Sequence, residues 1–221
     1  MAIIDSNLQS GVQPILNVKV PFFGVVAAAA ACLSFATMAR HGFDDAGLRL
    51  ASEAAWRFAS FVFFAAVVAG PLCRLFPYHG LKRLNGFCRQ MIWSFSTSYA
   101  VFLAVLLLPN TLGGVTHDDA TLGMTMFALF GGGAAGVMAY AASREAGQRL
   151  GAKSQRALLS VAGAFFWLTY SLTGLAHLSG PHRPDGFYGL SLSLMILALL
   201  LRFADRFVAK LWGTSEPSPQ A

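Results

Sequence analysis

Long apolar runs separated by short polar segments dominate this chain. A helix needs about 17 to 25 mostly apolar residues to cross the roughly 30 Å hydrocarbon layer of a bilayer. Six segments with few or no charges reach or approach that length: Pro21 to Ala39, Ala54 to Cys73, Met91 to Leu108, Leu122 to Ala142, Ala157 to Ala176 and Phe187 to Leu201. The pattern predicts an all-α polytopic membrane protein, a bundle of six transmembrane helices.

Composition supports lipid as the solvent. Of 221 residues, 56% are apolar and 12% are charged, whereas a soluble domain is about half apolar and a quarter charged. The mean hydropathy is +0.58. This apolar excess is too large to be hidden inside one small globule, so the helices are expected to lie in contact with the membrane bilayer.

The segments outside the apolar runs are short, and no internal repeat or second domain is visible. We expect residues 1–20 to form a cytoplasmic N-terminal tail, residues 21–212 the six-span transmembrane domain, and residues 213–221 a flexible C-terminal tail. The first charged residue is Asp5, and no basic stretch precedes the first apolar run. A cleaved secretory signal is therefore not expected.

The positions of Lys and Arg predict the orientation, because cytoplasmic loops near membrane spans are rich in both. With both termini inside, 12 of the 16 basic residues lie on the cytoplasmic side, and Arg40, Arg49, Arg57 and Arg183 lie outside. This division predicts both termini in the cytoplasm and a bacterial-type cytoplasmic (inner) membrane. The net charge of +6 forms no continuous basic face, so we expect no nucleic acid partner.

Charge and cysteine placement disfavour several classes of function. No acidic residue lies within the six predicted segments, and intramembrane ionisable residues are the usual mark of ion or proton transport. A pump, a proton-coupled transporter and a channel with charged rings are therefore disfavoured, whereas a carrier of a hydrophobic molecule stays open. The three cysteines are odd in number and widely spaced, which indicates neither a disulfide framework nor a zinc site.

Polar and aromatic side chains gather in the third and fifth predicted helices. Trp93 and Tyr99 lie beside a run of serines and a threonine, and Trp167 and Tyr170 lie beside a similar group. Side by side, these four aromatic residues would line an interior pocket for a quinone, a pigment or a lipid. The alternative is that the hydroxyls bond to their own helices and line nothing.

The histidines lie at the predicted helix ends and in loops. His41, His117, His177 and His182 fall on the predicted outer side and His79 on the inner side, so none lies in the middle of a span. His41, His117 and His177 are candidate ligands for copper or zinc. The alternative is that these imidazoles are simply solvated.

Several short motifs between about Ala54 and Arg206 give a resemblance to a known family. The chain reads Pro-Leu-Cys-Arg at 71–74, then Lys-Arg-Leu-Asn-Gly-Phe at 82–87, Thr-Leu-Gly at 121–123 and Gln-Arg-Leu-Gly-Ala-Lys at 148–153. In this order they resemble the ferric-reductase-like transmembrane domain, and within it the haem-binding membrane subunit of the periplasmic methionine sulfoxide reductase type. The resemblance implies a six-span fold and electron transfer through haem b.

The resemblance also implies where haem-ligating histidines would stand. The corresponding positions here are Ser96 or Leu103 in the third helix, Leu158 and Leu159 early in the fifth, and Leu172 about a dozen residues later. None of these side chains ligates iron. The histidines that the family would use are therefore missing from this sequence.

Two functions follow as the main hypotheses. One is a haem-free accessory or structural subunit that packs against other membrane protein subunits, pigment or lipid, with no catalytic activity of its own. The other is a membrane electron-transfer subunit that binds haem b or a quinone, with His41 and His177 as ligands on the outer side.

Overall fold

The computed structural model describes residues 22–75, 84–112, 119–179 and 186–211. These residues form six helices and contain no strand: α1 (Phe22–His41), α2 (Asp45–Leu75), α3 (Leu84–Leu112), α4 (Asp119–Ala141), α5 (Arg144–Ser179) and α6 (Gly186–Leu211). All six are long and apolar enough to cross a membrane. The predicted all-α six-span membrane protein is therefore confirmed, while the predicted tails lie outside the described residues.

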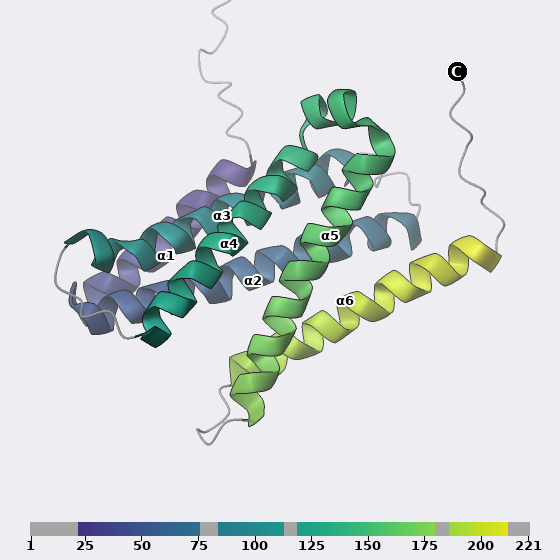
Figure 1. The fold of residues 1–221 in the computed structure, drawn as a ribbon. Helices are drawn as coiled ribbons and strands as arrows, with labels where there is room; N and C mark the ends of the chain where they lie inside the picture. The colour runs from purple at the N-terminus through teal and green to yellow at the C-terminus, as the bar shows by residue number, and fades with distance from the viewer. Residues whose placement is uncertain (1–21, 76–83, 113–118, 180–185, 212–221) are drawn as a thin grey trace, which may run out of the picture.

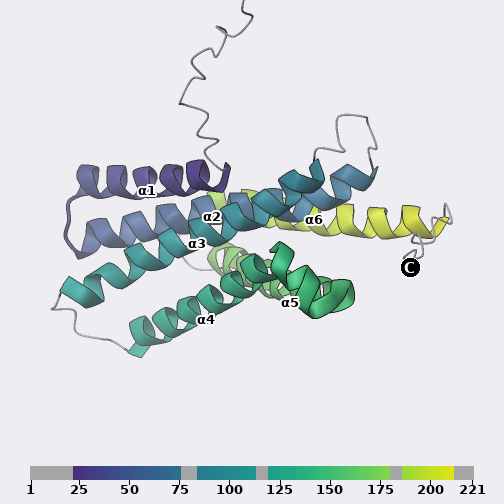
Figure 2. The same ribbon diagram turned by 90° about the horizontal axis from the view of Figure 1, so that it is seen from above.

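Five of the helices form a closed ring. Following contacts around it, α2 packs on α3, α3 on α4, α4 on α5, α5 on α6, and α6 on α2 again. The first helix, α1, lies outside the ring against α2 and α3 (Figure 1). Figure 2 shows α1 at one edge of the molecule and α4 and α5 at the opposite edge. The ring encloses a centre that side chains of several helices share.

Successive helices run in opposite directions. We call proximal the end of the bundle where α1 begins and α6 ends, and distal the other end. In Figure 1 the proximal end is on the right and the distal end on the left, and α5 crosses steeply between them. With six crossings, the start of α1 and the end of α6 lie at the same end of the bundle; that both termini face the cytoplasm stays a prediction from charge.

The second helix begins earlier than the apolar pattern predicts. It starts at Asp45, nine residues before Ala54, and its candidate span covers Asp45–Leu72. Glu53 therefore lies within a membrane-crossing helix, and the expectation of no acidic residue in the spans is wrong for α2. The physical reason is that Glu53 forms an ion pair with Arg57 one turn later, so neither charge interrupts the helix.

A tight turn joins α1 to α2 at the distal end. The helix α1 ends at His41. Gly42, the next residue, has a positive φ of 103° that suits glycine, and its amide donates to Met38 O at 2.8 Å. Asp44 caps the start of α2, because its Oδ1 accepts from the Gly47 amide at 2.9 Å. A Cβ at Gly47 would stand 2.0 Å from Gly42 O. The turn therefore requires glycine at position 47.

Gly47→Ala is expected to lower the free energy of unfolding by about 1–2 kcal/mol, because the new methyl group meets backbone that only a shift of the turn can move. Gly70→Ala in the same helix is the control, since a Cβ there meets nothing within 4 Å. That change should be neutral or stabilising by up to about 1 kcal/mol. Equal effects of the two substitutions on the denaturation midpoint in detergent would contradict the close approach.

Candidate functional site

Aromatic side chains fill the centre of the helix ring. Phe63 of α2, Phe95 and Tyr99 of α3, and Phe166 and Tyr170 of α5 are each at most 2% exposed. Trp56 and Phe102 pack onto this group. We call these seven residues the aromatic core.

The rings of the aromatic core contact one another across three helices. The centroids of Phe95 and Phe166 are 4.7 Å apart in an edge-to-face arrangement, and those of Trp56 and Tyr170 are 4.5 Å apart. Phe63 lies 5.0 Å from Phe95. Such pairs stabilise by about 0.5–1.5 kcal/mol beyond ordinary burial. In the interior, contacts between aromatic rings therefore hold α5 to α2 and α3.

The structure brings together two of the four aromatic residues predicted to line an interior pocket. Tyr99 and Tyr170 both belong to the aromatic core. Trp93 faces α1, where its ring lies 6.1 Å from that of Phe23. Trp167 packs against the buried cluster that contains both tyrosines, and its Nε1 donates to Met195 O of α6 at 2.9 Å. The two tryptophans thus take part in different helix interfaces.

Most of the hydroxyls near these aromatic residues bond to backbone. Ser94 and Ser98 donate to carbonyls one turn earlier in α3, and Ser96 donates across to Ala135 O of α4 at 2.9 Å. Tyr170 Oη and Ser171 Oγ are buried without a hydrogen-bond partner among the described residues. The Tyr170 hydroxyl is therefore a polar group of the aromatic core that could still form a hydrogen bond.

Glycines let α4 approach α3 beside the aromatic core. A Cβ at Gly131 would stand 2.1 Å from Tyr99 Oη, and one at Gly132 would stand 2.4 Å from Leu103 Cδ1. Tyr99 Oη donates to Ala128 O of α4 at 3.2 Å. Gly136, one turn beyond Gly132, is exposed and has open space around it. Gly136 therefore takes no part in this close approach.

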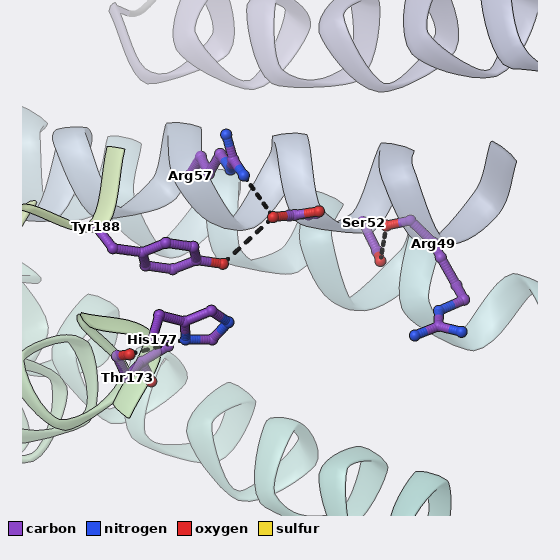
Figure 3. Close-up of polar contacts among 7 residues, drawn as sticks. Arg49, Ser52, Arg57, Thr173, His177 and Tyr188 are labelled. Atoms are coloured by element: carbon purple, nitrogen blue, oxygen red, sulfur yellow. Dashed lines mark hydrogen bonds and ion pairs between the residues drawn. The ribbon is translucent and has the colours of Figure 1, made fainter. Parts of the chain in front are cut away.

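A second group of side chains, polar and aromatic, lies toward the distal end, between α2, α5 and α6 (Figure 3). Arg57 Nη2 forms an ion pair with Glu53 Oε1 at 2.5 Å. Tyr188 Oη, from the first turn of α6, donates to the same carboxylate oxygen at 3.3 Å. His177, in the last turn of α5, completes what we call the distal cluster: Glu53, Arg57, His177 and Tyr188.

Tyr188 connects the three helices of the distal cluster. The His177 ring stacks on the Tyr188 ring with centroids 3.8 Å apart and planes inclined by 15°, and His177 Nδ1 contacts Thr173 O at 2.9 Å. The Arg57 guanidinium lies 5.6 Å from the centroid of Tyr188. Figure 3 shows the tyrosine ring between the arginine and the histidine. These contacts connect the end of α5 and the start of α6 to α2.

The predicted metal site on the outer side lies only partly in the described residues. His41 ends α1, His177 belongs to the distal cluster, and His117 lies outside the described residues. Where the structure describes the chain, no three His, Cys, Asp or Glu side chains are grouped so that they could hold a metal ion. The structure thus gives His177 aromatic and carbonyl partners.

The side chains in the ring centre do not fit a haem. A membrane haem b needs imidazoles that face each other inside the bundle, and among the described helices histidine occurs only at His41 and His177, near helix ends. The positions implied by the family resemblance also point differently: Leu172 is 56% exposed, whereas Leu103 packs against the core. The space between the helices is taken by aromatic rings.

Sequence reasoning missed Trp56, Phe63, Phe95 and Phe166 of the aromatic core, and Glu53, Arg57 and Tyr188 of the distal cluster. A signal for the core exists in helical spacing. Phe95 and Tyr99, and likewise Phe166 and Tyr170, are four residues apart, while Trp56 and Phe63 are seven apart. Both spacings put the two rings on one helix face.

Comparison of this chain with protein-family models, with curated proteins and with solved structures finds no match.

Proposed function

We propose that this integral membrane protein is a haem-free accessory or structural subunit built on a ferric-reductase-like plan, in a bacterial-type cytoplasmic membrane with both termini inside. The observation that carries the proposal is the aromatic core. A redox subunit of that plan needs room and ligands for a porphyrin, whereas this chain places mutually packed rings between α2, α3 and α5. In this proposal, the packed rings hold the helices rigidly together and take no part in electron transfer.

Exposed helix faces support a role in assembly. Beyond Ala198, the described side chains of α6 are exposed or half-buried, among them Leu200, Phe203 and Phe207, each about 60% exposed. On α4, Met124 and Phe130 are about 70% exposed. In a membrane protein without partners, lipid covers such faces. In a complex, helices of other membrane subunits pack on the same kind of apolar surface. The proposed partners are therefore lipid and neighbouring membrane proteins.

The absorption spectrum of the detergent-purified protein tests this proposal. We expect a colourless protein that, when isolated gently from its own membrane, is held at fixed stoichiometry in a larger complex. A Soret band with a reducible b-type α band, present at one haem per chain and lost in His177→Ala, would overturn the haem-free proposal. His177→Gln, which keeps a polar side chain at that position, controls for general disruption of the distal cluster.

A further inference from the structure

The fifth helix bends near its start. Gly151 has φ +72° and ψ 157°, which only glycine adopts easily, and it divides a short segment that begins at Arg144 from the long spanning helix. The charge-free run starts at Ala157. Figure 1 shows this elbow beyond the end of α4. We call residues 144–156 the α5 elbow.

Polar contacts hold the α5 elbow against the proximal end of the bundle. Gln155 Nε2 donates to Ala141 O at the end of α4, and Ser143 Oγ accepts from the Ala146 amide at 3.1 Å. Ala146 is fully buried. The Gln155 contact places the bend level with the end of the apolar α4 helix. With α4 spanning a bilayer up to Ala141, the elbow is expected at the depth where the hydrocarbon ends and lipid headgroups begin.

The outward side of the elbow is basic. Its sequence carries four basic residues and one acidic residue, Glu145. Arg149, Lys153 and Arg156 are all exposed. Arg149 forms an ion pair with Glu145 at 2.7 Å. Lys153 and Arg156 are three residues apart after the bend, so they share one helix face. Leu150, between the charges, is 37% exposed.

We propose that the α5 elbow binds the phosphate headgroups of anionic phospholipids, with Lys153 and Arg156 as the principal contacts. The argument is charge complementarity at a fixed depth. Basic side chains near a membrane surface attract anionic lipid by about 1 kcal/mol each, and here the bend holds them at headgroup level instead of leaving them on a free loop. Anionic lipid would thereby fix the proximal end of α5 in the membrane.

Native mass spectrometry of the detergent-purified full chain, titrated with phosphatidylglycerol and separately with phosphatidylcholine, tests this assignment. We expect phosphatidylglycerol to bind more tightly than phosphatidylcholine, and the double variant Lys153→Gln, Arg156→Gln to lose about 30-fold in its affinity for phosphatidylglycerol. The charge-matched control is Arg40→Gln, Arg49→Gln, which removes two exposed arginines near the distal end. This control should bind phosphatidylglycerol as the wild type does.

Two outcomes would overturn the proposal. Equal losses in both double variants would show that net charge alone attracts the lipid. Release of phosphatidylglycerol by an equal concentration of inorganic phosphate would show a site for free phosphate instead of lipid. Lys153→Arg with Arg156→Lys should keep the affinity within about twofold, and equal circular dichroism of all variants excludes misfolding as the cause of a loss.

Discussion

Phe166→Ala is expected to lower the free energy of unfolding of this protein by about 3 kcal/mol. Phe166 is fully buried, and its ring contacts Phe63, Phe95 and Tyr99 at centroid distances of 5.8, 4.7 and 5.2 Å. Truncation of a buried phenylalanine costs about 3–5 kcal/mol in a soluble core. The low end of this range applies here, because the side chains of separated helices in lipid still have apolar surroundings. The substitution therefore removes packing contacts but no hydrophobic transfer energy.

Unfolding in mixed micelles, followed by circular dichroism as sodium dodecyl sulfate is added, measures this effect. Leu168→Ala is the control on the same helix, since Leu168 is 54% exposed. Its side chain is expected to contact lipid in the folded and in the unfolded state alike. That variant should stay within about 0.5 kcal/mol of the wild type. If the two substitutions lower the free energy of unfolding equally, the centre of the helix ring is loosely packed. The haem-free proposal then loses its main support.

The membrane architecture followed from the sequence because lipid imposes a simple rule on length and charge. An uncharged run of about 20 residues has few alternatives to a crossing helix, so all six helices were predicted. The start of α2 is not predicted correctly, because a count of charged residues treats Glu53 and Arg57 as two separate unfavourable charges in the membrane. In the structure they lie one turn apart and neutralise each other, which a residue count does not register.

The interior was harder to predict than the spans, because it depends on helix rotation. Tyr99 and Trp93 are six residues apart in α3, which turns them to different faces: Tyr99 faces the ring centre and Trp93 faces α1. In α5, Tyr170 and Trp167 are three residues apart and both pack on the core cluster, while the Trp167 indole also bonds to α6. All apolar faces of a membrane helix resemble one another, so hydropathy did not show which face points inward.

Arg57→Met is expected to lower the free energy of unfolding by about 2–3 kcal/mol, because it leaves the Glu53 carboxylate without its cation. Removing one partner of a buried ion pair costs about 3–5 kcal/mol, and a carboxylate at the centre of a membrane helix costs about 3 kcal/mol on insertion scales. The pair here is roughly one-third exposed, which lowers the estimate. Tyr188 still donates to Glu53, so part of the carboxylate's bonding survives.

A double-mutant cycle with Glu53→Gln separates the ion pair from general disruption. Glu53→Gln alone should cost about 1 kcal/mol, since the Arg57 guanidinium keeps the Phe187 ring at 4.8 Å. The double variant should then be more stable than Arg57→Met alone, because the stranded charge is gone.

The matched comparison is Arg149→Met, which breaks the Glu145 pair of the same one-turn spacing at 70% and 61% exposure and should cost about 0.3–0.5 kcal/mol. The same sodium dodecyl sulfate titration measures all four variants. If Arg57→Met is as mild as Arg149→Met, water surrounds Glu53, and the membrane-crossing part of α2 begins only after Arg57. A larger cost for Arg57→Met places the pair inside the bilayer and makes the distal cluster an internal tie between α2 and α6.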